Sequence, residues 1–85
     1  MTEKVLVKFS AKWCTPCKSL ENVMINYSDQ IKVDEIQNFD IEDNRDVAIE
    51  FGIRSVPTLV LFEDGNEVRR KSGFMNIDQL KEFIG

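Results

Sequence analysis

Apolar residues alternate with polar ones, or form short apolar runs, in four stretches of the chain, and such patterns are typical of β-strands. We expect strands at residues 5–10, within residues 36–41, at residues 58–62 and at residues 67–72. The third stretch is apolar throughout, as in a strand that is buried on both faces. Asp64-Gly65 lies between the last two stretches and is typical of a tight turn, which predicts an antiparallel hairpin.

Apolar residues recur three and four positions apart in three further stretches, which predicts three amphipathic helices. The first begins near Pro16, because a proline lacks the N–H that a first turn leaves unpaired. Asp43 or Asn44 can cap the second helix and Gly52 suits its end, while Asn76 caps the third. The residues expected on the apolar faces are Cys17, Leu20, Met24 and Tyr27 in the first helix, Val47, Ala48 and Phe51 in the second, and Ile77, Leu80, Phe83 and Ile84 in the third. The resulting order, βαβαββα, predicts a single α/β domain over residues 1–85.

Length and composition restrict the class of protein. The chain has 85 residues, of which 42% are hydrophobic and 31% charged, as is typical of one small folded domain. Its formal charge of -4 argues against nucleic acid as a partner, because binding to phosphates needs clustered Lys and Arg. No apolar stretch reaches the ~18 residues that span a membrane, and no signal-peptide pattern follows Met1. We therefore expect a cytoplasmic protein that does not enter membranes.

The possible chemistry is restricted by the absence of histidine and by the two cysteines, Cys14 and Cys17. Without histidine, the commonest general base and most zinc sites are excluded. A structural disulfide across so short a loop would add only roughly 2 kcal/mol of stability. A metal site needs about four good ligands, which only carboxylates or a second copy of the chain could complete. Metal binding and a pair of inert buried thiols remain open beside reversible thiol–disulfide chemistry.

The position of Cys14, directly before a predicted helix, favours this redox chemistry. Unpaired N–H groups and the positive end of the helix dipole stabilise a thiolate there, so the pKa of Cys14 is predicted to fall below the ~8.5 of a free thiol. We expect an exposed Cys14 to attack a substrate disulfide and a shielded Cys17 to resolve the mixed disulfide. Trp13 is predicted to provide a flat apolar contact beside the cysteines.

Four separated motifs, in the right order, resemble those of the thioredoxin family. They are Trp-Cys-Thr-Pro-Cys-Lys at residues 13–18, Gly-Ile-Arg-Ser-Val-Pro-Thr at residues 52–58, Asp64-Gly65 in the hairpin turn, and Gly73 before the last helix. The resemblance covers almost the whole chain but starts at the family's second strand, so we expect the usual first strand and helix to be absent. It implies a minimal thioredoxin fold, with a four-stranded mixed sheet flanked by helices.

The resemblance also implies a substrate groove beside the cysteines. In the family, the proline that corresponds to Pro57 follows a cis peptide bond and faces the cysteine loop. The backbone before it pairs with an extended substrate, and here that residue would be Val56. Phe74 would either add an apolar lip or join the core. The substrate-binding residues so implied are Trp13, Thr15, Pro16, Val56, Pro57 and Gly73.

Positions behind the cysteines depart from the family pattern. Lys8 stands where the family carries a buried aspartate, so it must find a carboxylate, with Asp40 as the candidate, lose its proton or reach solvent. Asn38 replaces a lysine that many members place on the neighbouring strand. Ser10 replaces a tryptophan, so we expect different packing behind the loop. We expect Lys8 to favour the thiolate electrostatically, and Lys18 to tune the thiols as well.

The function that the resemblance implies is a thiol–disulfide oxidoreductase that reduces protein disulfides in a reducing cytoplasm. It implies recharging by a flavin-containing thioredoxin reductase, no metal, and no cofactor besides the Cys14–Cys17 disulfide. Ribonucleotide reductase is a candidate substrate by analogy, and we expect a monomer. Two alternatives are a glutaredoxin-like carrier recharged by glutathione and a non-catalytic module that binds a partner around Trp13 and Pro57.

Overall fold

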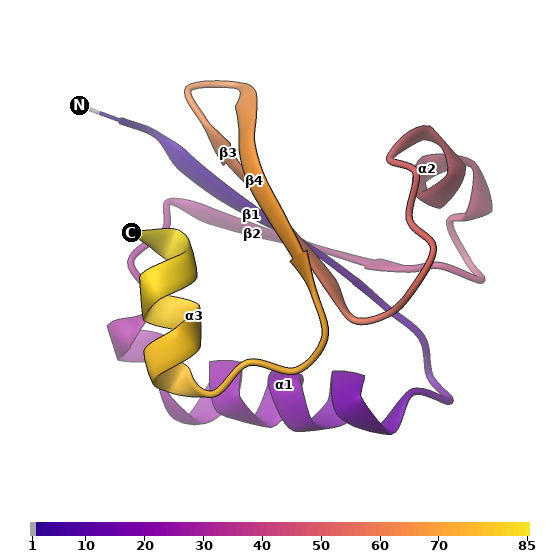
Figure 1. Ribbon diagram of the computed structural model, residues 1–85, viewed down its shortest axis with the longest axis horizontal. Coiled ribbons are helices and arrows are strands. Elements are labelled where there is room, and N and C mark those ends of the chain that lie inside the picture. The colour runs from indigo at the N-terminus through magenta and orange to yellow at the C-terminus, as the bar shows by residue number, and fades with distance from the viewer. Residues whose placement is uncertain (1) are drawn as a thin grey trace.

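The computed structural model describes residues 2–85, which form a four-stranded mixed sheet with three α-helices (Figure 1). In chain order the elements are β1 (Lys4–Ser10), α1 (Thr15–Asn26), a short 3₁₀ helix η1 (Ser28–Gln30), β2 (Glu35–Asp40), α2 (Arg45–Glu50), β3 (Thr58–Glu63), β4 (Asn66–Ser72) and α3 (Ile77–Ile84). The predicted order βαβαββα is confirmed, with η1 as an addition that the sequence patterns do not indicate. Within residues 2–85, no helix has the length and apolar character needed to cross a membrane.

The strand order of the sheet is β2-β1-β3-β4. β1 lies parallel to β2 and antiparallel to β3, while β3 and β4 form the predicted antiparallel hairpin. Asp64 and Gly65 turn this hairpin with positive φ angles of 52° and 84°, which these residue types adopt at little cost. The buried strand residues lie on β1 and β3, because only these two strands have a partner on each side.

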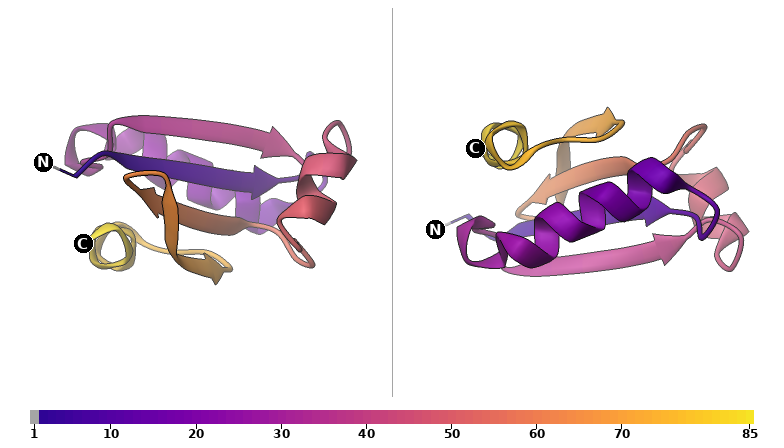
Figure 2. Two further views of the ribbon diagram at one scale, coloured as in Figure 1. Left: turned by 90° about the horizontal axis from the view of Figure 1, so that it is seen from above. Right: turned by 90° about the horizontal axis from the view of Figure 1, so that it is seen from below.

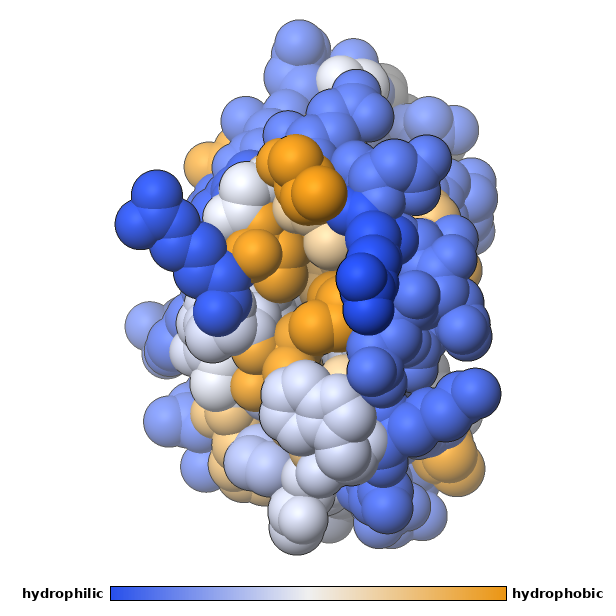
Figure 3. All heavy atoms as spheres, turned by 90° about the vertical axis from the view of Figure 1, so that its right-hand side faces the viewer, coloured by the Kyte–Doolittle hydropathy of each residue, from blue (hydrophilic) through white to orange (hydrophobic). Residues whose placement is uncertain are grey.

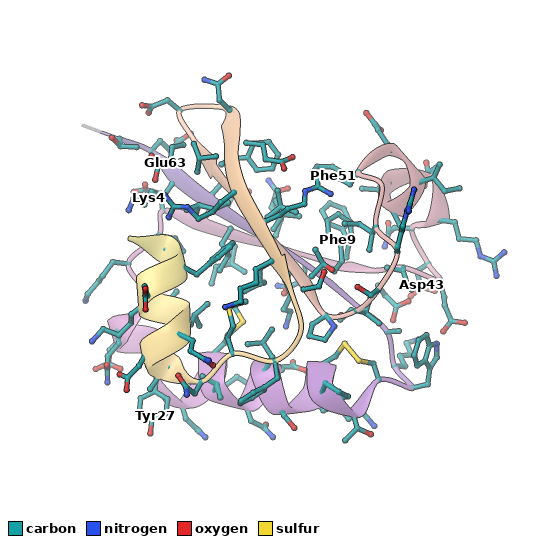
Figure 4. The ribbon with its side chains drawn as sticks, viewed as in Figure 1. Lys4, Phe9, Tyr27, Asp43, Phe51 and Glu63 are labelled. Atoms are coloured by element: carbon teal, nitrogen blue, oxygen red, sulfur yellow. A yellow bond between two sulfur atoms is a disulfide. The ribbon has the colours of Figure 1, made fainter. Side chains whose placement is uncertain are left out.

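Helices cover both faces of the sheet (Figure 2). α1 and α3 share one face, whereas α2 lies on the opposite face, at the end where β1 and β2 finish. The core between the sheet and α1 and α3 consists of Leu6, Leu20, Met24, Ile31, Leu59, Leu61, Met75, Leu80, Phe83 and Ile84. On the α2 side the core is aromatic. The Phe9 ring stacks on Phe39 with centroids 5.6 Å apart and lies 5.2 Å from Phe51 (Figure 4).

Strand alternation decides which side chains of β1 face α1. Leu6 belongs to the core on the α1 side, and Phe9 belongs to the core on the α2 side. Successive side chains of a strand point to opposite faces, so Lys8 lies on the same face as Leu6. The lysine is therefore directed toward the helix that begins at the cysteine loop.

The helix ends show two differences from the sequence patterns. Tyr27, which the spacing places on an apolar face, instead caps the carboxyl end of α1 and is exposed, because the chain leaves the helix there to enter η1. Asn44 precedes α2 as predicted, but its side chain makes no capping bond. It donates to the carbonyl oxygen of Asp40 at 3.1 Å, within the turn that follows β2. The Asn76 cap of α3 is confirmed, and Gln79 completes a capping box.

Candidate active site

The two cysteines lie at the amino end of α1, just after the loop that leaves β1 (Figure 4). Cys14 and Cys17 are joined by a disulfide, with their Cα atoms 5.3 Å apart. Cys14 is the N-cap residue of α1, and Pro16 stands in the first turn as predicted. The N–H of Cys14 donates to the carbonyl oxygen of Ala11 at 3.1 Å, which closes the loop before the helix. The local sequence thus places a disulfide across the first turn of a helix.

The surroundings of the Cys14 sulfur suit a negative charge. The backbone N–H of Cys17 donates to Cys14 Sγ at 3.2 Å. The start of a helix leaves this N–H without a backbone partner, and the helix dipole adds positive potential at the same place. The first turn of α1 contains no acidic residue that would oppose this potential. After reduction, a thiolate on Cys14 would be stabilised by the same N–H group and by the dipole.

The expected contrast between an exposed Cys14 and a shielded Cys17 is not found in the disulfide form. Both residues are only 4% exposed. Ala11 is buried with them, and Ile41 and Val56 pack against this small cluster. Cys14 is covered because its sulfur is bonded to the buried Cys17 and faces Val56. The expectation that Cys14 is exposed is therefore wrong for the oxidised protein.

Three of the predicted groove residues meet next to the disulfide. The carbonyl oxygen of Val56 lies 3.6 Å from Cys14 Sγ, and the Val56–Pro57 peptide bond is cis, as the resemblance implies. The carbonyl oxygen of Pro57 accepts a hydrogen bond of 2.8 Å from the N–H of Gly73. Gly73 has a φ of 100°, which residues with a side chain rarely adopt. The loop before β3 and the loop after β4 are thereby tied together beside the cysteines.

The other predicted groove residues, Trp13, Thr15 and Pro16, are exposed around the disulfide. On this end of the molecule, hydrophobic side chains form a strip that hydrophilic ones border on both sides (Figure 3). Phe74 is 46% exposed, whereas the next residue, Met75, is fully buried. Phe74 is expected either at an apolar lip of the groove or in the core. Its exposure agrees with the lip and not with a core position.

Lys8 lies behind the cysteine loop and is buried, with 7% of its surface exposed. Burial lowers the pKa of its amine from the usual 10.5, and the carboxylate of Glu21 on α1 partly opposes this shift. Asn38 is the register partner of Lys8 on β2. Asp40 lies two positions further along β2, and its carboxylate accepts the backbone N–H of Glu42 at 2.8 Å. The expectation that Asp40 is the acidic partner of Lys8 is wrong, because the carboxylate that acts on the lysine comes from α1.

Glu21 is the residue near the site that sequence analysis misses. It follows Cys17 by four positions, a spacing at which two side chains share one face of a helix, and this spacing is the signal that could have found it. Two grooves lie behind the loop: one of about 400 Å³ is lined by Cys17 and Lys18, and one of about 610 Å³ is lined by Lys8. Glu21 and Ser10 line both grooves. A carboxylate therefore lies between Cys17 and the buried lysine.

Possible metal ligands are dispersed over the described part of the chain. Among residues 2–85, no three side chains of His, Cys, Asp or Glu lie close enough together to hold an ion. The two cysteines, the strongest candidates for metal ligands, are bonded to each other. The geometry thus favours the redox interpretation of the cysteine pair.

Comparisons with known proteins agree with this geometry. The family model described as Thioredoxin matches residues 1–85. The thioredoxin of Chlamydia muridarum is 41% identical over 80 residues, which cover 94% of this chain and 78% of that protein. The thioredoxin of Pseudomonas aeruginosa is 38% identical over 84 residues, which cover 94% of this chain and 75% of that protein.

Solved structures give the same result. A mutant thioredoxin from Halobacterium salinarum has a TM-score of 0.85 and 39% identity, and the match covers 96% of this chain and 72% of that one. The thioredoxin of Fasciola hepatica has a TM-score of 0.82 and 31% identity, with 96% and 78% of the two chains covered.

The class of protein follows from what the site can do. One sulfur can be held as an anion at a helix N-terminus, and a second lies within bonding distance, so the chain can accept and return electrons as a thiol–disulfide oxidoreductase does. The chain belongs to the thioredoxin family. Its partners are accordingly disulfide-containing proteins and a reductase that restores the dithiol.

Proposed function

We propose that the chain reduces disulfides in other proteins with Cys14 as the nucleophile and Cys17 as the resolving cysteine. The observation that carries this assignment is the hydrogen bond of 3.2 Å from the Cys17 N–H to Cys14 Sγ. Cys14 is the N-cap residue, so its sulfur receives the full effect of the helix N-terminus, whereas Cys17 lies inside the first turn. A thiolate therefore forms more readily on Cys14 than on Cys17.

The reaction balances in two exchange steps. The Cys14 thiolate attacks one sulfur of the substrate disulfide, and the other substrate sulfur leaves as a thiolate that takes up a proton. The Cys17 thiol then loses its proton and attacks Cys14 Sγ, which releases the second substrate sulfur. The substrate has then gained two electrons and two protons, and the Cys14–Cys17 disulfide remains. A reductase returns two electrons to this disulfide in a separate reaction.

We assign substrate binding to the surface around the disulfide. The carbonyl oxygen of Val56 is 3.6 Å from Cys14 Sγ, so an extended segment that lies along Val56 brings its own disulfide to Cys14. The exposed Trp13 ring supplies apolar contact area at low entropic cost, since it has few rotatable bonds. The groove so proposed consists of Trp13, Thr15, Pro16, Val56, Pro57 and Gly73.

Two lysines are proposed to tune the thiols. Lys8 lies on the face of the sheet that α1 covers. There its protonated amine, which is positively charged, favours a thiolate in the cysteine loop. Lys18 lines the groove that contacts Cys17 and adds positive potential from the solvent side. Glu21 stands between these two lysines and reduces their combined effect.

The chain is proposed to act as a monomeric, single thioredoxin-like domain in the cytoplasm. The disulfide is its only redox group in this proposal. A flavin-containing thioredoxin reductase recharges it, and ribonucleotide reductase is a candidate substrate. Family membership and the thioredoxins of two bacteria among its relatives support this assignment.

The test is reduction of the disulfides of insulin by the chain in the presence of a thioredoxin reductase and NADPH. Wild type should be active and Cys14→Ser inactive, whereas Cys17→Ser should accumulate a mixed disulfide through Cys14 that mass spectrometry detects. A mixed disulfide in Cys14→Ser but not in Cys17→Ser would reverse the two roles. Equally fast recharging by glutathione alone would indicate a glutaredoxin-like carrier. Full biological activity of a variant without both cysteines would indicate a binding module.

A further inference from the structure

We infer that Phe74 and Pro16 form a pocket that binds a large apolar side chain of the substrate, close to the reacting cysteine of that substrate. This inference rests on the proposed function and adds a class of substrate to it. The preferred substrates are polypeptides in which an aromatic or large aliphatic residue flanks the disulfide.

The pocket lies on the surface beside the first turns of α1 and has a volume of about 300 Å³. Its lining consists of Thr15, Pro16, Ser19 and Phe74. None of these side chains is charged, and the Ser19 hydroxyl already donates to the carbonyl oxygen of Thr15 at 3.4 Å. An apolar side chain that enters displaces water from a neutral surface, whereas a charged one would lose hydration without gaining a partner.

The backbone fixes Phe74 from both sides. The N–H of Gly73 is bonded to the carbonyl oxygen of Pro57 at 2.8 Å, and Met75 is fully buried in the core. The half-exposed ring between these two fixed points is a pre-formed wall of the pocket. Substrate binding therefore does not have to order this loop, which removes one cost of association.

The pocket lies next to the cysteine pair along the chain. Thr15 and Pro16 are the two residues between Cys14 and Cys17, and Gly73, which is tied to the Pro57 loop, directly precedes Phe74. An extended chain advances ~3.3 Å per residue, so a substrate whose sulfur reaches Cys14 has a neighbouring side chain within reach of the pocket. By contrast, Ile25 is an exposed apolar residue further along α1 that does not line this pocket.

The expected effect is a preference of about tenfold for Phe or Leu over Ser next to the substrate cysteine, which is the usual effect of one apolar side chain in a pocket. The pocket contacts the substrate in the ground state and in the transition state alike. The preference should therefore appear in the protein concentration that gives half of the maximal rate, and the maximal rate itself should be unchanged.

The experiment uses two series of cyclic disulfide peptides that carry Phe, Leu, Ser or Asp, in one series before a cysteine and in the other after it. Each peptide is mixed with an excess of the reduced protein, and its reduction is followed by chromatography over a range of protein concentrations. The proteins are wild type, Phe74→Ala, Phe74→Leu and, as the matched control, Ile25→Ala. Circular dichroism verifies that each variant is folded.

In at least one series, wild type and Ile25→Ala should prefer Phe and Leu about tenfold over Ser and Asp. Phe74→Ala should lose most of this preference, and Phe74→Leu should keep it. Equal rates for all peptides with wild type, or a preference that survives in Phe74→Ala, would overturn the pocket. If Phe74→Ala does not fold, the wild-type series and Phe74→Leu still decide. Failure of wild type to reduce any peptide would instead refute the proposed function.

Discussion

The two sides of the cysteine loop are held by different interactions. On the substrate side, backbone groups set the geometry, with the Cys17 N–H on Cys14 Sγ and the Val56 carbonyl oxygen next to the same sulfur. Behind the loop, the buried Lys8 of β1 and the carboxylate of Glu21 of α1 line a groove. Backbone N–H and C=O groups keep their partial charges at every pH, whereas an amine and a carboxylate gain or lose a proton as the pH changes. From this comparison we propose that the backbone makes Cys14 reactive and that the side chains behind the loop adjust this reactivity.

The largest expected effect tests the substrate side and separates the two cysteines. In the reduced protein, Cys14 should be alkylated by iodoacetamide at neutral pH at least about tenfold faster than Cys17, because only its sulfur lies at the helix N-terminus. Mass spectrometry of digested samples at several reaction times measures both rates. If both rates equal that of a thiol in an unstructured peptide, the backbone does not activate Cys14.

A second prediction concerns Gly73, whose φ of 100° is unfavourable for any side chain. Open space surrounds the position of an added Cβ, so Gly73→Ala should lower the free energy of unfolding by about 1 to 2 kcal/mol through backbone strain alone. It should also slow insulin reduction, because a residue that avoids this φ shifts the loop that the backbone N–H of residue 73 ties to Pro57.

The matched control is Gly65→Ala in the hairpin turn, where φ is 84° and the space is also open. It should lose a similar amount of stability in urea denaturation while keeping the rate of reduction. Equal slowing in both variants would show that general destabilisation, not the loop at the site, is responsible.

A smaller effect is expected from the charge behind the loop. Lys8→Met removes a positive charge from the face toward α1, so the pKa of Cys14 should rise and its alkylation at neutral pH should slow roughly two- to threefold. Lys32→Met, which removes an exposed lysine distant from the site, serves as the control and should leave the rate unchanged. A titration of Cys14 that is the same in wild type and Lys8→Met would refute a tuning role for Lys8.

The smallest expected effect concerns stability at alkaline pH in the oxidised protein. Burial lowers the pKa of Lys8 in the folded state, so the unfolded chain binds more protons between that lowered value and the usual 10.5. The contribution of Lys8 to the free energy of unfolding should therefore rise with pH in this window. Urea denaturation at a series of pH values should show this rise in wild type but not in Lys8→Met.

The variant Glu21→Gln tests the influence of the Glu21 carboxylate in the same urea denaturation series. The Glu21 carboxylate raises the pKa of Lys8 against the effect of burial, so its removal should move the start of the rise to lower pH. Titrations of other groups are common to wild type and variant and cancel in the difference between their curves. Curves that coincide for wild type and Glu21→Gln would show that the carboxylate has no influence on the buried lysine.

The order of the elements and the position of Cys14 could be predicted because they depend on local patterns. Side-chain alternation, helical spacing, Pro16 and the turn at Asp64-Gly65 each act over a few neighbouring residues. The same local logic places Cys14 at the start of a helix, whatever the rest of the chain does. These features are therefore readable from the sequence alone.

Only the tertiary structure decides which distant segments meet at the site. The carboxylate that acts on Lys8 belongs to Glu21 and not to Asp40, Val56 covers Cys14 in the disulfide form, and Phe74 is exposed instead of buried. Each outcome depends on how α1 and the loops pack against the sheet. That packing is determined by burial of the whole core. The spacing within one element, such as that of Cys17 and Glu21, does not show which residue of another element the side chain meets.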